Sequence, residues 1–76
     1  GEDKIQARRP QNLSPKELEV LQLVTSGYSN AQIAAAMGVA TTTVDSYKER
    51  IKTKFGLDTI VECVAHAVAS DLVQER

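Results

Sequence analysis

Three glycines, Gly27, Gly38 and Gly56, divide most of the sequence into short segments with helical periodicity. Glycine commonly follows the last turn of a helix, because it adopts a left-handed backbone conformation without a Cβ clash. Only Val39 and Ala40 separate Gly38 from the next periodic segment. Two helices joined by so short a turn have to cross steeply. The chain is therefore constrained to a set of short helices, two of which cross at Gly38.

Residues with helix-capping chemistry stand where these segments begin. Ser14 with Glu17, and Ser29 with Gln32, have the spacing of a capping box. In that motif the hydroxyl and the side chain three residues later each accept a hydrogen bond from a backbone N–H of the first turn. The last segment begins near Asp58 or Thr59, either of which has a side chain suited to an N-cap. These three segments are thus predicted to begin as helices directly after their capping residues.

Apolar residues recur every three or four positions in each segment, as in amphipathic helices. Val44, Tyr47, Ile51 and Phe55 share one arc of a helical wheel, and the opposite face is polar. No strand pattern or internal repeat is present. We expect helices at about 15–26, 30–37, 41–55 and 59–71. The other core-facing residues expected are Leu18, Val20, Leu21, Leu23, Val24, Ile33, Ala34 and Met37.

The length of 76 residues allows one small domain, and the aromatic content of 4% requires an aliphatic core. Residues 1–12 lack periodicity and are expected to be a linker or tail, with the domain at 13–76. Arg8 and Arg9 in that tail either touch phosphates or are simply solvated. The first residue is Gly rather than Met, so we expect a fragment of a longer protein.

No apolar run is long enough to span a bilayer, and no secretion leader opens the chain. A cytoplasmic location without membrane contact is therefore expected.

The chemistry of an enzyme or a metalloprotein is missing from the sequence. A single cysteine excludes a disulfide framework and a cysteine-rich zinc site. Cys63 and His66 have metal-ligand spacing, but no further Cys or His exists to complete a site. His66 has no nucleophile and carboxylate arranged with it, and no glycine-rich phosphate loop occurs. We expect no enzyme, no metal, no cofactor and no small-molecule ligand in this fragment.

The overall charge argues mildly against nucleic-acid binding, because the net charge is −1 and the isoelectric point is about 5.7, whereas nucleic-acid-binding domains commonly exceed a pI of about 9. The charges are nevertheless segregated along the chain. Lys48, Arg50, Lys52 and Lys54 fall within seven residues and are opposed only by Glu49. This local basic run is suited to phosphate contacts, although a solvated helix face would have the same composition.

Ala34, Gly38, Val44 and Tyr47 together have the pattern of a helix-turn-helix motif. A small residue lets the second helix cross close to the first, a glycine makes the turn, and an early apolar residue holds the second helix in place. The polar face of that helix is then free to enter a major groove about 12 Å wide. An ordinary small helical bundle is the alternative interpretation.

Residues 13–72 resemble the LuxR-type (GerE-like) helix-turn-helix domain found at the C-terminus of many bacterial response regulators and quorum-sensing regulators. The resemblance is carried by LSPKELEVL at 13–21, GYSNAQIA at 27–34, VATTTV at 39–44 and KFGL at 54–57. It implies an all-α, four-helix DNA-binding domain with its helix-turn-helix at 30–55. It further implies a homodimer through the last helix, promoter DNA as partner, and a role in transcription regulation; it also allows a contact with RNA polymerase.

The resemblance and the polar face of residues 41–55 together define the expected sites. Thr43 either contacts DNA or caps the helix locally. The apolar stripe on the last helix either forms a dimer interface or packs entirely on the rest of the domain. Its members are Ile60, Val61, Val64, Ala65, Val68 and Leu72. The expected DNA-binding residues are Thr41, Thr42, Thr43, Asp45, Ser46, Lys48, Glu49, Arg50, Lys52 and Lys54. The expected dimer-interface residues are Ile60, Val61, Val64, Ala65 and Val68.

Asp45 stands where the family most often has a lysine that contacts DNA. A carboxylate there has one of three effects. It lowers the affinity for phosphates, it accepts a hydrogen bond from a cytosine amino group, or it orients a neighbouring cation. Lys48 and Lys52 follow Asp45 and Glu49 by three residues each.

DNA binding is the favoured function. The alternative is a degenerate helix-turn-helix that serves as a protein-interaction or dimerisation module without DNA. The remaining departures from the family pattern are Ala31, Tyr47, Arg50 and Ile60.

Overall fold

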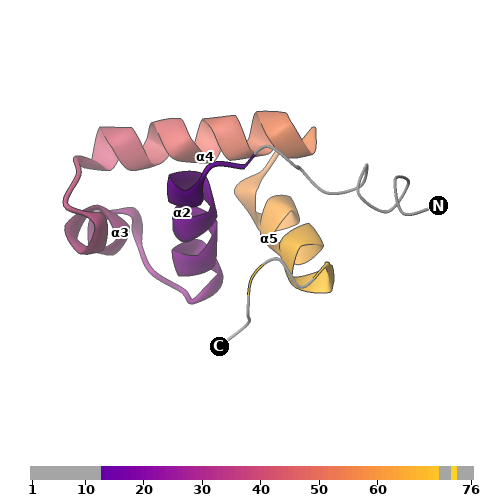
Figure 1. The fold of residues 1–76 in the computed structure, drawn as a ribbon, viewed down its shortest axis with the longest axis horizontal. Helices are drawn as coiled ribbons and strands as arrows, with labels where there is room; N and C mark the ends of the chain where they lie inside the picture. Colours follow the sequence, from indigo (N-terminus) through magenta and orange to yellow (C-terminus); the bar gives the residue numbers. More distant parts are fainter. Residues whose placement is uncertain (1–12, 71–72, 74–76) are drawn as a thin grey trace.

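The computed structural model describes residues 13–70 and residue 73, and within them it contains four helices and no strand (Figure 1). The helices are α2 (Pro15–Thr25), α3 (Asn30–Met37), α4 (Thr41–Phe55) and α5 (Ile60–Ala69). The all-α architecture predicted from the sequence is confirmed. The linker expected at residues 1–12 lies outside the described residues.

Both predicted capping boxes are present. Ser14 Oγ accepts a hydrogen bond from the backbone N–H of Glu17 at 3.1 Å, and Glu17 Oε1 accepts from the N–H of Ser14 at 2.9 Å. The same reciprocal pair joins Ser29 and Gln32 at 3.2 and 2.8 Å. The starts of α2 and α3 are therefore determined locally, before any tertiary contact is considered.

The ends of the first and last helices differ slightly from prediction. Helix α2 ends at Thr25, with Ser26 as its C-cap. Helix α5 begins at Ile60 because Thr59 is extended, with φ −130° and ψ 152°, and its hydroxyl accepts from the N–H of Glu62 at 3.2 Å. Thr59 is thus the cap, and Ser70 closes the helix at its other end. Residue 71 lies outside the described part of the chain.

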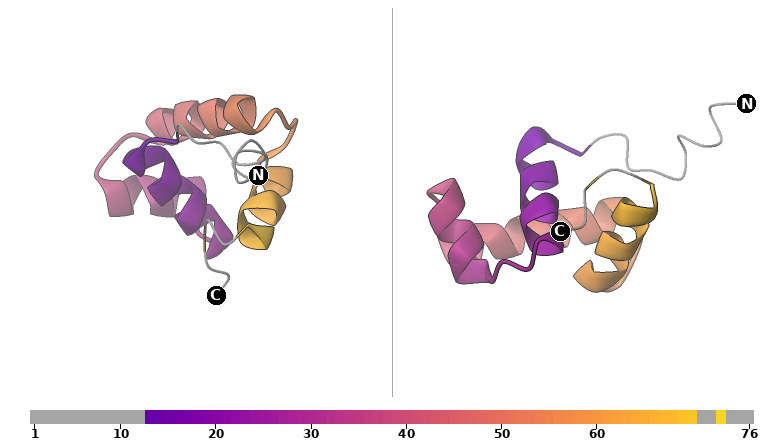
Figure 2. Two further views of the ribbon diagram at one scale, coloured as in Figure 1. Left: turned by 45° about the vertical axis from the view of Figure 1, so that its right-hand side comes forward. Right: turned by 90° about the horizontal axis from the view of Figure 1, so that it is seen from below.

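Helix α4 lies across the domain and is the element that the others share. It contacts α2, α3 and α5, and in Figures 1 and 2 it runs from α3 at one end to α5 at the other, with α2 between them. Gly38 makes the turn into it with a φ of 71°, a left-handed conformation that favours glycine. Figure 1 shows α3 nearly along its axis while α4 lies across the view, so the predicted steep crossing is confirmed.

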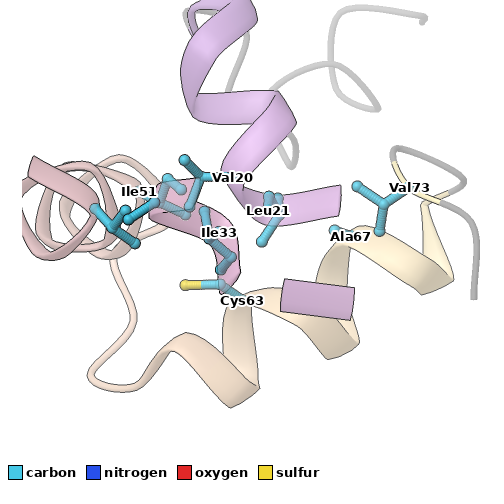
Figure 3. Packing of buried hydrophobic residues seen from close by; sticks show 9 residues of the cluster. Val20, Leu21, Ile33, Ile51, Cys63, Ala67 and Val73 are labelled. Carbon is cyan, nitrogen blue, oxygen red and sulfur yellow. The ribbon is translucent and has the colours of Figure 1, made fainter. Parts of the chain in front are cut away.

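An aliphatic core fills the space beneath α4, as the low aromatic content predicts (Figure 3). Its buried members are Val20, Leu21, Ile33, Ala34, Val44, Ile51, Cys63, Ala67 and Val73. Burial raises the pKa of the Cys63 thiol, so this side chain stays protonated and packs as a small apolar group. Tyr47 and Phe55 are half-buried against the core, as their helical spacing predicts. Leu72, the last member of the predicted stripe, lies outside the described residues.

Replacing Ile51 by alanine is expected to destabilise the domain by about 2–5 kcal/mol, because its fully buried side chain would leave a cavity under α4. Urea unfolding followed by circular dichroism measures the change. Thr53→Ala, at an exposed position of the same helix, is the control and should leave the midpoint nearly unchanged. A loss below about 1 kcal/mol for Ile51→Ala would mean that α4 is not seated on this core.

Candidate DNA-binding surface

The polar face of α4 is open to solvent along its length, opposite the edge that enters the core. Val44 and Ile51 are fully buried on the core side. Tyr47 and Lys48 are half-buried at the boundary between the two faces. The exposed residues of α4 are Thr41, Thr42, Asp45, Ser46, Glu49, Arg50 and Thr53. We call this set, together with Lys48, the α4 polar face.

The start of α4 differs from the starts of the other three helices. Its N-cap residue is Ala40, and no side chain caps the helix. Thr43, which is half-buried, therefore does not act as the local cap considered from the sequence. The first-turn backbone N–H groups of α4 receive no side-chain acceptor, whereas Ser14, Ser29 and Thr59 supply one to the other helices.

Asn30, at the first position of α3, holds two residues of α4 through one side-chain amide. Its Nδ2 donates a hydrogen bond to Asp45 Oδ1 at 2.7 Å, and its Oδ1 accepts from Lys48 Nζ. These three side chains, the Asn30 cluster, cross the helix-turn-helix junction. Asn30 is absent from the predicted site, although it lies in the segment GYSNAQIA that resembles the family. Only the crossing of the two helices brings it to Asp45.

The other charged residues of the α4 polar face are also paired. Glu49 forms an ion pair with Lys52 at 2.7 Å, one turn further along the helix, and that hydrogen bond raises the pKa of Lys52. The guanidinium of Arg50 lies 5.7 Å from the centre of the Tyr47 ring, a cation–π geometry. Each carboxylate predicted on this face thus has a hydrogen-bonding partner, the Asn30 amide for Asp45 and the Lys52 ammonium for Glu49. Of these two partners, only the Lys52 ammonium offsets the charge of its carboxylate.

Lys54 connects the end of α4 to the beginning of α2. Its Nζ lies 2.6 Å from Glu17 Oε1, and the side chain of Glu17 is only 4% exposed. Burial alone would raise the pKa of Glu17, but the hydrogen bonds from Lys54 and from Ser14 outweigh it, so the pKa lies below its ordinary value. The ammonium of Lys54 is therefore engaged within the domain, which the sequence did not indicate when Lys54 was predicted to contact DNA.

The apolar stripe of α5 divides into two parts. Ile60, Val64 and Val68 are half-buried and pack against the core. Val61 is 72% exposed and Ala65, one turn further on, is exposed as well. Packing within the domain thus accounts for three of the five residues predicted at a dimer interface. Val61 and Ala65 remain uncovered in the isolated chain.

Cys63 and His66, whose spacing is that of metal ligands, have different surroundings in the structure. Cys63 is in the core, whereas His66 is exposed, with its ring centroid 6.3 Å from that of Phe55. Among residues 13–70 and 73, no three Cys, His, Asp or Glu side chains gather where a metal ion would bind. In the same residues, every helix is too short or too polar to traverse a lipid bilayer.

Two crossed helices on a shared core, with the second helix exposing a polar face, define a helix-turn-helix domain. The family model GerE, described as bacterial regulatory proteins of the luxR family, matches residues 11–67. The chain belongs to this family, whose helix-turn-helix is a DNA-binding domain of transcription regulation.

The chain is also similar to the oxygen regulatory protein NreC of Staphylococcus aureus strains JH9 and Mu3. In both cases it is 40% identical over 62 residues, which cover 82% of this chain and 29% of NreC. The chain therefore spans less than a third of the length of these relatives.

Lys54→Met is expected to destabilise the domain by about 1–3 kcal/mol at pH 7, because it leaves the buried Glu17 carboxylate without its charged donor. Urea unfolding measures the difference. Lys52→Met is the matched control and should change stability little, because the Glu49 side chain of that pair is 71% exposed. Equal effects of the two substitutions would contradict the assignment of Lys54 as a tether.

Acid unfolding tests the same pair independently. Because the pKa of Glu17 is lowered by folding, its contribution is complete above the unfolded-state pKa of about 4.3 and is lost as the pH falls through the lower native value. Glu17→Gln removes the titrating group. We expect the free energy of unfolding of this variant to fall less steeply between about pH 5 and pH 3 than that of the unsubstituted chain.

Proposed function

We propose that α4 is the recognition helix of a sequence-specific regulator, lying in the major groove of promoter DNA while α3 packs behind it. The observation that carries the proposal is the α4 polar face, which is uncovered while the opposite edge of the helix is fixed in the core. A helix is narrow enough to fit a major groove about 12 Å wide, and exposed polar side chains are what read base edges there.

Lys48 and Arg50 are the best candidates for phosphate contacts. Arg50 is exposed, and its guanidinium carries five N–H donors suited to phosphate oxygens. Lys48 uses one donor on Asn30, and an ammonium has three. Lys52 and Lys54 are engaged by Glu49 and Glu17, so we assign them a smaller share of the electrostatic binding energy. Thr41, Thr42 and Ser46 supply neutral hydroxyl donors to phosphates or bases.

A homodimer through α5 is the second part of the proposal. Val61 and Ala65 place an uncovered apolar strip on one side of this helix, and a second copy of the chain would remove it from water. Dimeric helix-turn-helix proteins contact two half-sites about one turn of DNA apart, which doubles the number of phosphates bound. Such doubling suits a chain with a net charge of −1 in which few cations of the described residues are exposed.

The proposed biological role is the DNA-binding output of a longer cytoplasmic regulator. Family membership supports transcription regulation, and the partial coverage of NreC supports a larger parent protein. We assign the parent to the response regulators of two-component systems, or else to the quorum-sensing regulators. Contact with RNA polymerase belongs to the same proposal.

Lys48→Ala and Arg50→Ala are each expected to weaken binding to every duplex sequence and to lower the slope of log affinity against log salt by about 0.9. Fluorescence anisotropy with a labelled duplex, over a series of salt concentrations, measures both. Lys16→Ala removes one positive charge from an exposed residue of α2 and is the matched control, with an unchanged slope expected. If the slope of log affinity against log salt is the same for all three variants, Lys48 and Arg50 are excluded as phosphate ligands.

The same titration separates DNA binding from the alternative of a protein-interaction module. Salt-sensitive binding of duplex DNA by the unsubstituted chain supports the recognition-helix proposal. Failure to bind any duplex at low salt, in a chain that still dimerises, would establish the interaction module instead.

Val61→Glu is expected to shift the chain from dimer to monomer, because it places a charge in the strip that a second copy would cover. Sedimentation velocity over a range of concentrations reports the shift. Thr53→Glu adds the same charge to an exposed residue of α4 and should leave the sedimentation coefficient unchanged. A purely monomeric unsubstituted chain at high concentration would rule out this interface.

A further inference from the structure

We infer that Asn30 determines base preference by positioning Asp45 as a hydrogen-bond acceptor for a cytosine amino group. The inference rests on the proposed entry of α4 into the major groove and assigns a specificity role within that site. Asn30 itself is a positioning residue, since it acts through Asp45.

The chemistry of its two partners determines the orientation of the Asn30 amide. A carboxylate only accepts hydrogen bonds and an ammonium only donates them. The Asn30 Nδ2 therefore has to face Asp45, and its Oδ1 has to face Lys48, as the structure shows. With the amide rotated by half a turn, both contacts would be repulsive. Asn30 thus holds the Asp45 side chain in one orientation, although Asp45 is exposed and would otherwise sample several rotamers.

One oxygen of the Asp45 carboxylate is left available. Oδ1 accepts from Asn30 at 2.7 Å, and Oδ2 has no hydrogen-bond partner within the described part of the chain. In the major groove, cytosine presents the N4 amino donor, which Asp and Glu side chains accept, whereas thymine presents an O4 acceptor at the corresponding place. A carboxylate oxygen fixed on the α4 polar face would therefore favour C·G over T·A at the base pair that it meets.

The Asn30 cluster also makes a carboxylate tolerable at this position. Lys48 and Asp45 are bound to opposite ends of one amide group, so the formal charges of the three side chains cancel. The repulsion between Asp45 and DNA phosphates is offset by a cation held in place beside it. Asp45 can then contribute to specificity without the full cost in affinity that an isolated acidic residue would impose.

The test selects duplexes from a pool with random central positions, using the unsubstituted 76-residue chain. Anisotropy then compares the selected duplex with one in which the preferred C·G pair is replaced by T·A. We expect the unsubstituted chain to discriminate between them on the order of tenfold. Asn30→Ala and Asp45→Ala should each reduce the ratio of dissociation constants to within about twofold, and the double variant should lose no more than either.

Two further variants separate positioning from folding. Asn30→Asp keeps the size of the side chain and an acceptor for Lys48 but loses the donor to Asp45, and it should also abolish the preference. Ala35→Gln, at an exposed position of α3, should preserve the preference. Circular dichroism melting confirms that each variant is folded.

The outcomes distinguish this inference from the function on which it rests. Weaker binding by Asn30→Ala and Asn30→Asp to all duplexes, with the C·G to T·A ratio unchanged, would overturn the role of Asn30 while leaving DNA binding intact. Absence of duplex binding by the unsubstituted chain at low salt would overturn both. The inference is supported when the Asn30 and Asp45 variants lose the C·G preference while the unsubstituted chain and Ala35→Gln keep it.

Discussion

The architecture depends on burial of one edge of α4. Val44 and Ile51 are fully buried, and the helix contacts α2, α3 and α5. One amphipathic helix supplies part of the core and all of the α4 polar face. The packing of the core and the placement of the polar face are therefore physically linked. The apolar edge determines where the helix lies, and the 3.6-residue repeat then determines which side chains face outward. A change in the core packing would therefore rotate or shift the residues proposed to meet DNA.

The local features of the fold were predictable from the sequence because they rely on short-range chemistry. The capping boxes at Ser14 and Ser29 involve residues three positions apart, and the turn at Gly38 needs a left-handed backbone. The buried edge of α4 follows from spacing alone. The difference at the start of α5 is local as well. The Thr59 side chain caps the helix, so Thr59 lies one residue before it rather than in its first turn.

The polar contacts of the site were not predictable in the same way. Glu17 and Lys54 are 37 residues apart, and Asn30 and Asp45 are 15 apart. Which side chains meet across a helix crossing depends on the crossing geometry and on the rotamers that it permits, neither of which is encoded in a periodic pattern. The sequence showed that a basic run and two carboxylates lie along α4. It did not show that Lys54 serves the interior of the domain while Arg50 remains exposed.

The Glu17 carboxylate joins two places that lie far apart in the sequence. A single oxygen accepts from the backbone of Ser14, where the described chain begins its first helix, and from Lys54 in the last turn of α4. A mechanical load on the backbone at Ser14 would therefore pass through that atom to the last turn of α4. Any movement that displaced Ser14 by more than a hydrogen-bond length would force this oxygen to give up one of its two donors.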